Sequence, residues 1–465
     1  MPELPEVETI KNILNNLIIG RTIREVKILN RNTIEGDESL FRQALINQTI
    51  NQVSRLGKFL IFHLSNNVVF LSHLRMEGKY FFYEKDQSVY DKHACVIFFF
   101  NDGSVLEYND TRKFGLMKLE KYSSYLDNLP LSKLGPEPFA IKSVDVLMQK
   151  AKKKQIPIKV LLLDQTFISG LGNIYVDEVL FKTKIHPETP ANLISKVQME
   201  ELVKASVDVL NMAIESGGST IRSYHPSQGI DGGFQTKLHA YGRENMPCLQ
   251  CNHPLRKTFV GGRGTTFCPI CQKNPASPHV VGITGPIGSG KSSVAEYYRQ
   301  HGYQALSGDA IVADLYQDGK VRSLISKLFG ANVILDDGSI NKDLIIATII
   351  EEPNKKRKLE KILHPRVEEV IIKKIKTMKR DEKLVLEIPL LFESKLDDYC
   401  NETIYVDINP EIQKKRLENR RIPVEISLAL NAGFDAKHNK QKATFVVDNS
   451  GSLKDLYASL KKIIY

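Results

Sequence analysis

The sequence predicts a multidomain protein. A leading helix and a mostly antiparallel β domain come first, a metal-binding segment follows, and an α/β domain with a parallel sheet ends the chain. Three observations support this architecture. Short apolar runs separated by turn residues fill the first part. Two Cys-x-x-Cys pairs lie near the middle. A glycine-rich loop then separates a buried-strand pattern from a helical one.

The length, charge and cysteine content of the sequence limit the class of protein it can encode. Its 465 residues suggest roughly two to four domains. The formal net charge of +10 favours a polyanionic partner such as a nucleic acid. No apolar run is long enough to cross a bilayer and no charged-then-apolar leader opens the chain, so we expect a cytoplasmic protein without a membrane partner. Without a secretion signal, the paired cysteines indicate a metal rather than disulfides.

The first residues contain a candidate nucleophile. Pro2 follows Met1, and a small second residue favours removal of Met1. Pro2 would then carry a free secondary amine with a pKa near ~8, which can attack an aldehyde-like carbon and form an iminium. Glu3 and Glu6 are close enough to move protons. A helix start is the alternative, with Pro5 in the first turn and acidic residues at the positive end of the dipole, and the local sequence alone favours it.

A helical pattern continues over residues 11–20, and short alternating apolar runs follow it. Turn signals such as Asn66-Asn67 separate the runs. Repeated short strands with tight turns predict a β-sandwich or a barrel. The runs cover residues 23–29, 50–64, 68–74, 95–100 and 105–108.

Three segments of this β domain are unusual for plain strands. They are Arg-Leu-Gly-Lys-Phe at 55–59, Ser-His-Leu-Arg-Met-Glu-Gly at 72–78 and Asp-Thr-Arg-Lys-Phe-Gly at 110–115. Solvated hairpins explain each segment separately. Together the segments could line a nucleic-acid groove, in which the cations hold phosphates while Met76 and Phe114 insert into a base stack.

The pattern becomes helical from about residue 134. Gly170-Leu171-Gly172-Asn173 precedes another helical stretch over 176–181. Small residues at a helix start let the backbone approach a phosphate. A tight turn between two helices explains them equally well.

The cysteine pairs predict one metal site. Cys248 and Cys251 form the first pair, and Cys268 and Cys271 form the second after a gap of sixteen residues. This spacing is typical of a tetrahedral Cys₄ zinc site, and four protein ligands leave no open position, so the zinc would be structural. Residues 257–267 between the pairs predict a β-hairpin with Arg263 at its tip.

The last part opens with a phosphate-binding pattern. Residues 285–292 fit Gly-x₄-Gly-Lys-Ser, between a buried-strand run at 279–284 and a helix from 293. In a P-loop of this kind Lys291 would neutralise phosphate oxygens and Ser292 would hold Mg²⁺. A tight strand–helix turn is the alternative. Further buried-strand runs at 384–388, 403–406 and 444–447, with basic helices such as 366–380 between them, predict a parallel sheet.

Two other features of this part have open interpretations. Asp309 follows a short apolar run and could be a base or a magnesium ligand, or it could be a helix N-cap. Arg416, Arg420 and Arg421 could close over phosphates as a lid, or they could form a solvated helix face.

Residues 1–273 resemble the bacterial formamidopyrimidine-DNA glycosylase family. The resemblance rests on Pro-Glu-Leu-Pro-Glu-Val-Glu-Thr at 2–9, the three β-domain segments above, Asp-Gln-Thr-Phe-Ile-Ser-Gly-Leu-Gly-Asn-Ile-Tyr at 164–175 and the cysteine hairpin. It implies a catalytic β-sandwich domain over 1–133, a helix–two-turn–helix domain over 134–236 and a zinc finger over 237–273, with DNA in the cleft. Residues 274–278 would be a linker to the last domain.

The resemblance implies a role for each residue of the active site. Pro2 would be the nucleophile at C1′ of the damaged nucleotide, Glu3 the acid/base that helps open the sugar, and Glu6 a helper. Lys58 would be the proton donor for β-elimination, and Arg263 the one for δ-elimination.

The resemblance also implies the DNA contacts and the lesions. Leu4 favours oxidised purines, such as 8-oxoguanine and formamidopyrimidines, over oxidised pyrimidines. Gln155 takes the place of a lysine of the family, and Lys154 precedes it. The expected DNA-binding residues, which include those that fill the space of a flipped base, are Met76, His93, Arg112, Phe114, Lys154 and Asn173.

Residues 279–465 resemble dephospho-coenzyme A kinase through the motifs at 282–292, 364–367, 388–393 and 447–451. The resemblance implies transfer of the ATP γ-phosphoryl group to the 3′-hydroxyl of dephospho-CoA, with Asp309 as candidate base. This part departs from the family at Ser307, at Pro286 and in the lid segment 429–433. The implied ATP-binding residues are Gly288, Ser289, Gly290, Lys291, Ser292 and Ser293.

Together these observations favour a monomeric, bifunctional enzyme that binds damaged double-stranded DNA, one zinc ion, ATP with Mg²⁺, and dephospho-CoA. Two alternatives remain. One is a repair glycosylase with a degenerate, kinase-inactive nucleotide-binding module. The other is a zinc-dependent DNA-binding scaffold without activity, which requires that Met1 is retained or that Pro2 is blocked.

Overall fold

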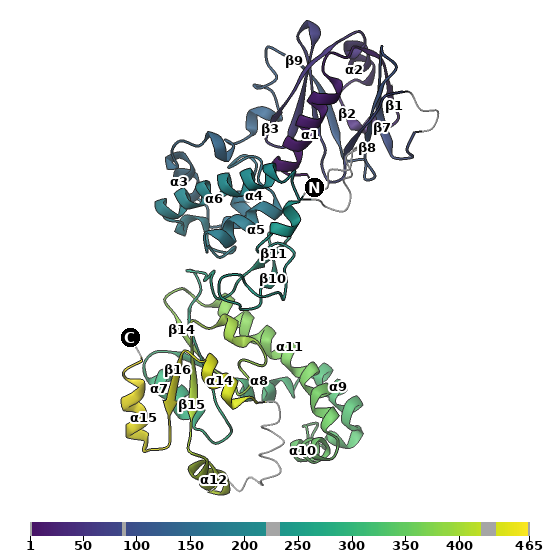
Figure 1. Cartoon of the computed structure of the whole chain (residues 1–465). Helices are drawn as coiled ribbons and strands as arrows, with labels where there is room; N and C mark the ends of the chain where they lie inside the picture. The colour runs from purple at the N-terminus through teal and green to yellow at the C-terminus, as the bar shows by residue number, and fades with distance from the viewer. Residues whose placement is uncertain (1, 86–89, 220–232, 420–433, 464–465) are drawn as a thin grey trace. The chain divides into compact units, whose positions relative to one another are not determined.

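The computed structural model describes residues 2–85, 90–219, 233–419 and 434–463. The chain forms two compact units, Met1–Asn274 and Pro275–Tyr465. In Figure 1 the first unit runs from purple to teal and the second from teal to yellow. In the described residues no helix is long and apolar enough to span a membrane.

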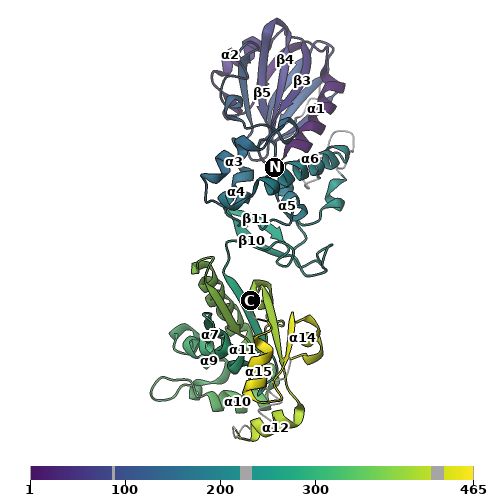
Figure 2. The ribbon, with the colours of Figure 1, turned by 90° about the vertical axis from the view of Figure 1, so that its left-hand side faces the viewer.

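The first unit begins with a helix against two β-sheets, as the sequence predicts. Helix α1 (Leu4–Ile18) precedes both sheets, and Figure 2 shows it beside the strands. One sheet has the order β1-β7-β8-β6 and the other the order β2-β9-β5-β4-β3, and all neighbours are antiparallel except β2 and β9. The strands are β1 (Ile23–Ile28), β2 (Ile34–Glu35), β3 (Ile50–Leu56), β4 (Phe59–Leu64), β5 (Val68–His73), β6 (Lys79–Tyr83), β7 (Ala94–Phe100), β8 (Val105–Asn109) and β9 (Leu116–Lys121).

Aromatic side chains from both sheets fill the space between them. Phe70 stacks on Phe62 of its own sheet at 4.2 Å and on Phe98 of the other sheet at 5.7 Å between ring centroids. The buried face of α1, including Val7 and Leu14, packs into the same core. Burial of this apolar surface therefore fixes α1, and with it the start of the chain, against the sandwich.

The structure corrects some expectations. Residues 50–64 are not one run but two strands, β3 and β4, joined by a two-residue turn at Gly57 and Lys58. The left-handed φ of +58° at Gly57 allows this turn. Strands β6 and β9 and helix α2 (Glu38–Leu45) were not predicted. The apolar residues of β6 and β9 lack a clear alternation, so packing rather than local pattern determines these strands. Helix α2 does have local signals, an N-cap at Asp37 and an apolar face with Phe41 and Leu45, which the sequence analysis did not use.

Four helices form the middle of the first unit: α3 (Asp145–Lys152), α4 (Ile158–Leu163), α5 (Asn173–Lys182) and α6 (Lys196–Glu215). Leu4 of α1 belongs to the same core as these helices. Helix α5 is buried from Ile174 to Phe181, which explains why its sequence shows little amphipathic pattern.

Two acidic residues of α5 hold the segment that follows the helices. Asp177 pairs with Lys159 at 2.5 Å, and both side chains are fully buried. The Asp177 carboxylate also accepts the backbone N–H of Thr266 in the hairpin of β10 (Arg256–Val260) and β11 (Arg263–Phe267). Glu178 accepts three backbone N–H groups over residues 239–241. The cysteine hairpin is thus anchored on α5.

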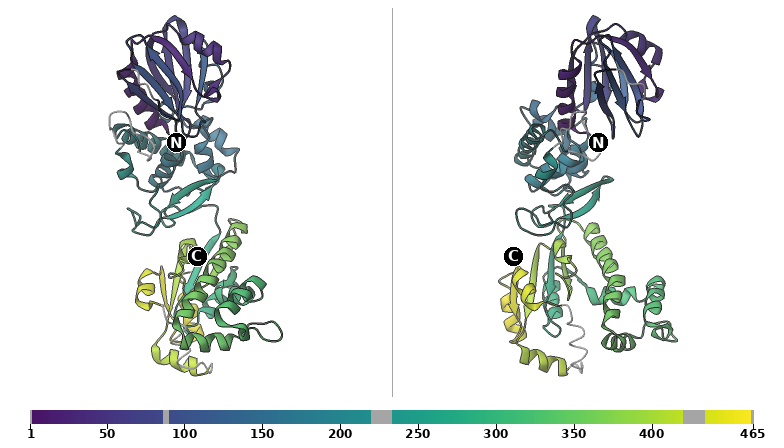
Figure 3. Two further views of the ribbon diagram at one scale, coloured as in Figure 1. Left: turned by 90° about the vertical axis from the view of Figure 1, so that its right-hand side faces the viewer. Right: turned by 45° about the vertical axis from the view of Figure 1, so that its right-hand side comes forward.

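The second unit is an α/β domain with a fully parallel sheet in the order β13-β14-β12-β15-β16. Alternate residues of its strands face two separate cores, so helices cover both faces, with green α11 and yellow α15 on opposite sides in Figure 3. The strands are β12 (His279–Thr284), β13 (Gln304–Ser307), β14 (Lys383–Glu387), β15 (Glu402–Asp407) and β16 (Phe445–Asp448).

The helices of the second unit include two that differ from the prediction. Helix α11 spans Pro353–Thr377, so the predicted basic helix at 366–380 starts earlier and ends sooner. Asp309 is not a helix N-cap, because Ser307 holds that position and Asp309 lies in the first turn. The other helices are α7 (Lys291–Gln300), α8 (Gly308–Leu315), α9 (Gly319–Phe329), α10 (Lys342–Glu351), α12 (Pro410–Asn419), α14 (Ala436–Lys442) and α15 (Leu453–Leu460).

Candidate active sites

The Glu3 side chain lies at the N-terminus of α5. Its carboxylate accepts the backbone N–H of Ile174 at 3.0 Å and that of Tyr175 at 3.5 Å, and Glu3 is only 2% exposed. The first N–H groups of a helix have no partner within the helix, and the helix dipole favours an anion there. Helix α5 therefore fixes the carboxylate that directly follows Pro2.

The glycines before α5 leave room for the start of the chain. A Cβ atom on Gly172 would lie 2.2 Å from the carboxyl carbon of Glu3. A Cβ atom on Gly170 would lie 2.4 Å from a methyl carbon of Leu4. The sequence pattern suggested a phosphate contact or a plain turn, whereas here a protein carboxylate occupies the helix N-terminus.

Glu6 makes a second set of contacts beside Glu3. One of its oxygens accepts the Glu3 backbone N–H at 2.9 Å. The other accepts the Tyr175 hydroxyl at 2.5 Å and the Ser219 N–H at 2.8 Å. The first turn of α1 is thereby tied to α5 and to the segment that follows α6.

The Lys58 ammonium group lies at the same place. Lys58 is 6% exposed, and its Nζ donates to the Leu171 carbonyl at 2.7 Å. Gln165 donates to the same carbonyl at 2.8 Å and accepts the Gly170 N–H at 3.0 Å, so it holds the glycine turn in shape. The β3–β4 turn and the start of α5, far apart in sequence, thus meet around Glu3.

The electrostatics of this group suit proton transfer. Burial raises the pKa of Glu3 to about 7; the Lys58 charge opposes this shift and the Glu6 charge adds to it. Burial lowers the pKa of Lys58, while Glu3 and Glu6 raise it and the nearby Arg263 lowers it. A carboxyl group with a pKa near neutrality can both give and accept a proton at physiological pH.

The two predicted DNA-contact loops lie together. Asp110 fixes one loop by accepting the N–H groups of Arg112, Phe114 and Gly115. In the other loop Glu77 accepts the Thr111 hydroxyl at 2.8 Å.

Both loops need glycine against one buried tyrosine, because a Cβ atom on Gly78 or Gly115 would overlap the Tyr108 hydroxyl at 2.2 or 1.7 Å. Phe114 projects from its loop with 57% exposure, beneath the Arg112 guanidinium. Met76, at the tip of the other loop, is half-buried.

The remaining predicted DNA contacts are spread over three elements. The carbonyl of half-buried His93 accepts the Asp110 N–H at 3.0 Å, which places this residue beside the Phe114 loop. Asn173 donates to the Gly264 carbonyl at 2.9 Å, so the start of α5 meets the hairpin near exposed Arg263. The Nζ atom of exposed Lys154 lies 3.7 Å from an Asp164 carboxylate oxygen, in a weak surface ion pair.

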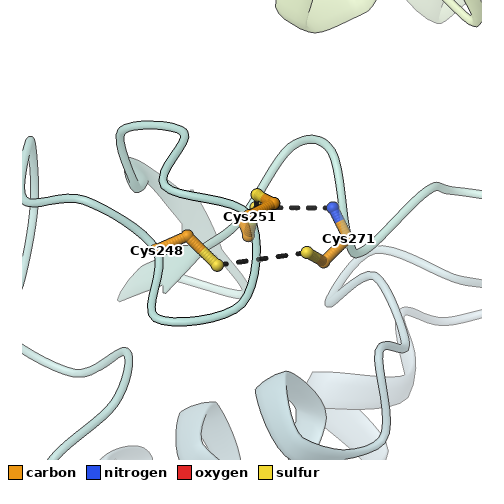
Figure 4. A group of neighbouring side chains, drawn as sticks. Cys248, Cys251 and Cys271 are labelled. Atoms are coloured by element: carbon orange, nitrogen blue, oxygen red, sulfur yellow. Dashed lines mark hydrogen bonds between the residues drawn. The ribbon is translucent and has the colours of Figure 1, made fainter.

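The four cysteines converge as the spacing predicts. All four sulfur atoms lie within 4.8 Å of one another. The Cys251 and Cys268 sulfurs are 3.5 Å apart and the Cys248 and Cys271 sulfurs 4.0 Å, and Figure 4 shows Cys248 and Cys271 facing each other. Zn–S bonds of about 2.3 Å in a tetrahedron give sulfur separations of roughly 3.8 Å. The cluster therefore fits a structural zinc ion.

In the second unit the glycine-rich loop connects β12 to α7. Gly288 and Gly290 have left-handed φ values of +78° and +92°. Lys291 Nζ donates to the carbonyls of Gly285 and Pro286, both at 3.0 Å, and lies folded over the loop. This strand–loop–helix arrangement is the context that a P-loop requires.

Two residues at this loop were given no role in the sequence analysis. Glu387, the last residue of β14, accepts the Ser292 hydroxyl at 2.6 Å. A carboxylate beside the P-loop serine is a standard partner for Mg²⁺. Asn449, after β16, donates to the Ser289 carbonyl at 2.7 Å. An acidic residue ending a buried-strand run was the available signal for Glu387.

The other residues that the sequence predicts for the kinase site are Asp309, three arginines and the lid segment. Asp309 is exposed near the carboxyl ends of β13 and β14, because Ser307 pairs with Glu387 in the sheet. Arg416 donates to the Asn449 carbonyl at 3.0 Å and so touches the P-loop support. Arg420, Arg421 and the lid segment 429–433 lie outside the described residues.

Three family models match the chain. The Formamidopyrimidine-DNA glycosylase N-terminal domain matches residues 1–117, and the Formamidopyrimidine-DNA glycosylase H2TH domain matches residues 134–225. The Dephospho-CoA kinase model matches residues 279–455. These matches confirm both resemblances found in the sequence.

Known proteins with similar sequences match the first unit of the chain. A formamidopyrimidine-DNA glycosylase of Bacillus licheniformis is 50% identical over 276 residues, which are 59% of this chain and 100% of that protein. One of Ligilactobacillus salivarius is 46% identical over 276 residues, 58% of this chain and 99% of that protein. A solved structure is that of a complex between Lactococcus lactis Fpg and an abasic site containing DNA. Its protein is 36% identical to this chain, with a TM-score of 0.55, and the match covers 59% of this chain and 100% of that protein.

The fold, the gathered acidic and basic side chains and these matches define an enzyme of the DNA-glycosylase class with an added kinase domain. The chain belongs to the formamidopyrimidine-DNA glycosylase family, and its second unit contains a dephospho-CoA kinase domain.

We expect Gly172→Ala to lower base excision on the order of 10²-fold, because the added methyl group displaces the Glu3 carboxylate from α5. Single-turnover excision on lesion DNA measures this effect. Gly233→Ala is the matched control, since its Cβ atom would meet its nearest neighbour at an ordinary 3.8 Å. Equal rates for the two variants would contradict the importance of the Glu3 position.

Proposed function

We propose that the first unit is a DNA glycosylase and AP lyase that removes oxidised purines from double-stranded DNA. The observation that supports this proposal best is the convergence of Glu3, Glu6 and Lys58 at the start of α5, directly beside Pro2. No part of a simple DNA-binding scaffold needs a buried carboxyl group with a pKa of about 7 next to a buried lysine.

The proposed reaction uses the Pro2 amine as nucleophile. Its nitrogen lone pair attacks C1′ as the glycosidic C–N bond breaks, and the proton that the Pro2 nitrogen loses passes to the departing base. Glu3 donates a proton to O4′, so the sugar ring opens and an iminium joins Pro2 to C1′. In β-elimination the C2′ proton would pass to the Glu3 carboxylate, which gave up its own proton in the ring-opening step. The C2′–H electron pair forms C2′=C3′, and the 3′ phosphate leaves with the C3′–O electron pair.

Lys58 and Arg263 would supply the protons for the eliminations. The Lys58 ammonium group is held beside Glu3, where it can protonate the oxygen that leaves from C3′. Arg263 stands at the hairpin next to the start of α5, and it would assist the second, δ-elimination. Met76, His93, Arg112, Phe114, Asn173 and Lys154 would contact the DNA.

A structural zinc ion in the cysteine cluster would keep the hairpin folded. Cys248, Cys251, Cys268 and Cys271 would hold the ion, which supplies cross-linking rather than reaction chemistry because no ligand position stays open. The hairpin in turn carries Arg263.

We propose that the second unit phosphorylates the 3′-hydroxyl of dephospho-CoA with ATP and Mg²⁺. The P-loop, including Gly288, Ser289, Gly290 and Ser293, would bind the phosphates with Lys291. Ser292 and Glu387 would hold Mg²⁺, since their oxygens already lie 2.6 Å apart. Asp309 would accept the substrate hydroxyl proton.

Borohydride trapping tests the lyase proposal. Incubation with 8-oxoguanine DNA and borohydride should yield a covalent adduct whose modified residue is Pro2, located by mass spectrometry. The same spectra show whether Met1 is absent, which the chemistry requires. Protein that lacks Met1 and binds this DNA but forms no adduct would favour the DNA-binding scaffold.

The raised pKa of Glu3 predicts a pH dependence. Because the protonated carboxyl group acts as acid, kcat/KM for excision should fall as pH rises through about 7. Glu6→Gln removes a charge that raises the Glu3 pKa, so this fall should move to lower pH. Glu38→Gln, in the ion pair of Glu38 with Arg42 at the start of α2, is the control and should leave the profile unchanged. An unmoved profile in Glu6→Gln would mean that Glu3 is not the titrating group.

Lys291→Ala should abolish phosphorylation of dephospho-CoA and leave base excision intact. The P-loop lysine neutralises phosphate charge in the transition state, and it belongs to a different unit from Pro2. Both activities are measured on one preparation of the full chain. Loss of both would mean coupled units, and wild-type protein that binds ATP without turnover would favour the inactive module.

A further inference from the structure

Lys58 is held by its backbone as well as by its ammonium group. It forms a two-residue hairpin turn with Gly57, closed by the pairing of Leu56 with Phe59. The Lys58 side chain leaves this turn and reaches the Leu171 carbonyl. The position of the ammonium group therefore depends on what fixes the turn.

Glu137 and Arg55 grip the Gly57 backbone from both sides. Glu137 Oε1 accepts the Gly57 N–H at 2.6 Å, and Arg55 Nη1 donates to the Gly57 carbonyl at 2.9 Å. Arg55 also donates to the two Glu137 oxygens at 2.5 and 3.2 Å. We call the Arg55 and Glu137 side chains the Lys58 brace. A bidentate pair of this kind is both strong and geometrically specific.

The Lys58 brace also reaches the helix that follows Pro2. Arg55 Nε donates to Glu8 Oε2 of α1 at 2.7 Å. The side chains of Arg55, Glu137 and Glu8 are 9%, 14% and 18% exposed, so water screens these contacts little. One guanidinium group thus connects α1 with the turn that carries Lys58.

The path of the chain before Glu137 is fixed as well. The Gly135 N–H donates to the Gln165 carbonyl at 2.8 Å, and a Cβ atom on Gly135 would lie 2.6 Å from the Phe167 carbonyl. The Ser169 N–H donates to the Pro136 carbonyl at 3.1 Å. Glu137 is therefore anchored to the segment that leads directly to Leu171, the partner of the Lys58 ammonium group.

We propose that Arg55 and Glu137 are positioning residues that hold Lys58 where it can protonate the oxygen leaving C3′ during β-elimination. This inference rests on the proposed role of Lys58. The brace acts through Lys58, whose ammonium proton passes to the phosphate oxygen as the C3′–O bond breaks. A displacement of about 1 Å at a reacting group can cost on the order of 10²-fold in rate.

Glu137→Gln and Arg55→Lys test the brace in the full chain. A glutamine places an NH₂ group against Arg55, and a lysine lacks the planar fork, so each change breaks the bidentate pair. On abasic-site DNA we expect β-elimination to slow roughly 10- to 100-fold in both variants. The rate of borohydride-trappable adduct formation at Pro2 should stay within about twofold, because the Glu3 contacts are unchanged. Glu38→Gln, whose pair with Arg42 is exposed, should leave both rates unchanged.

A double-mutant cycle with Lys58→Met separates positioning from general structure. If the brace acts through Lys58, Glu137→Gln should slow elimination no further in the Lys58→Met background. An additive loss, a normal elimination rate in both brace variants, or equal losses of trapping and elimination would overturn the inference. If Lys58→Met itself eliminates at the normal rate, the proposed role of Lys58 is wrong, and the brace proposal fails with it. If Lys58→Met eliminates slowly but both brace variants eliminate at the normal rate, the brace proposal is wrong while the proposed role of Lys58 stands.

Discussion

The contact between the Glu3 carboxylate and the first turn of α5 is the constraint on which the proposed catalytic site depends. Burying a carboxylate costs several kcal/mol unless other groups compensate. Here the N–H groups of Ile174 and Tyr175, the positive end of the helix dipole and the Lys58 charge offset that cost in part. The compensation is incomplete, and the pKa of Glu3 rises to about 7. Incomplete compensation is what gives this carboxyl group a proton to donate.

Helix α5 carries this constraint to the hairpin. Its N-terminus holds Glu3, and one turn later Asp177 binds both Lys159 and the backbone of β11. A buried ion pair is weak evidence for stability, because desolvation of two charges opposes their attraction. The pair does have a clear geometric effect, because Lys159 also donates to the carbonyl of Gly264, the residue next to Arg263. We interpret the Lys159–Asp177 pair as a contact that fixes the position of the hairpin, and with it the position of Arg263, relative to Glu3.

The sequence predicts those parts of the sites that are contiguous. The cysteine pairs and the Gly-x₄-Gly-Lys-Ser loop bring their own geometry with them, so the spacing alone was sufficient. Gly170 and Gly172 were ambiguous, because the side chains that require them, Leu4 and Glu3, lie far away in the sequence. Their role becomes visible only when the start of the chain is packed against α5.

Glu137 and Glu387 show the same limit. Locally one is an acidic residue between prolines and the other an acidic residue at a strand end. The structural role of each residue depends on a partner in another element: Glu137 accepts the Gly57 N–H, and Glu387 accepts the Ser292 hydroxyl. No periodicity or spacing encodes a contact between two such distant segments, so tertiary packing must supply it.

The departures of the kinase domain can be weighed by the same reasoning. A loop glycine is needed where φ is positive or where a Cβ atom would overlap a neighbour. Gly288 and Gly290 meet the first condition, whereas Pro286 has no left-handed φ and offers Lys291 only its carbonyl. A proline retains that carbonyl and fixes φ in the common negative range. The change at Pro286 therefore leaves the left-handed positions of the loop intact, but it removes one backbone N–H, the kind of donor with which a P-loop binds phosphate. Any effect of Pro286 on kinase activity would come from this lost donor rather than from the shape of the loop.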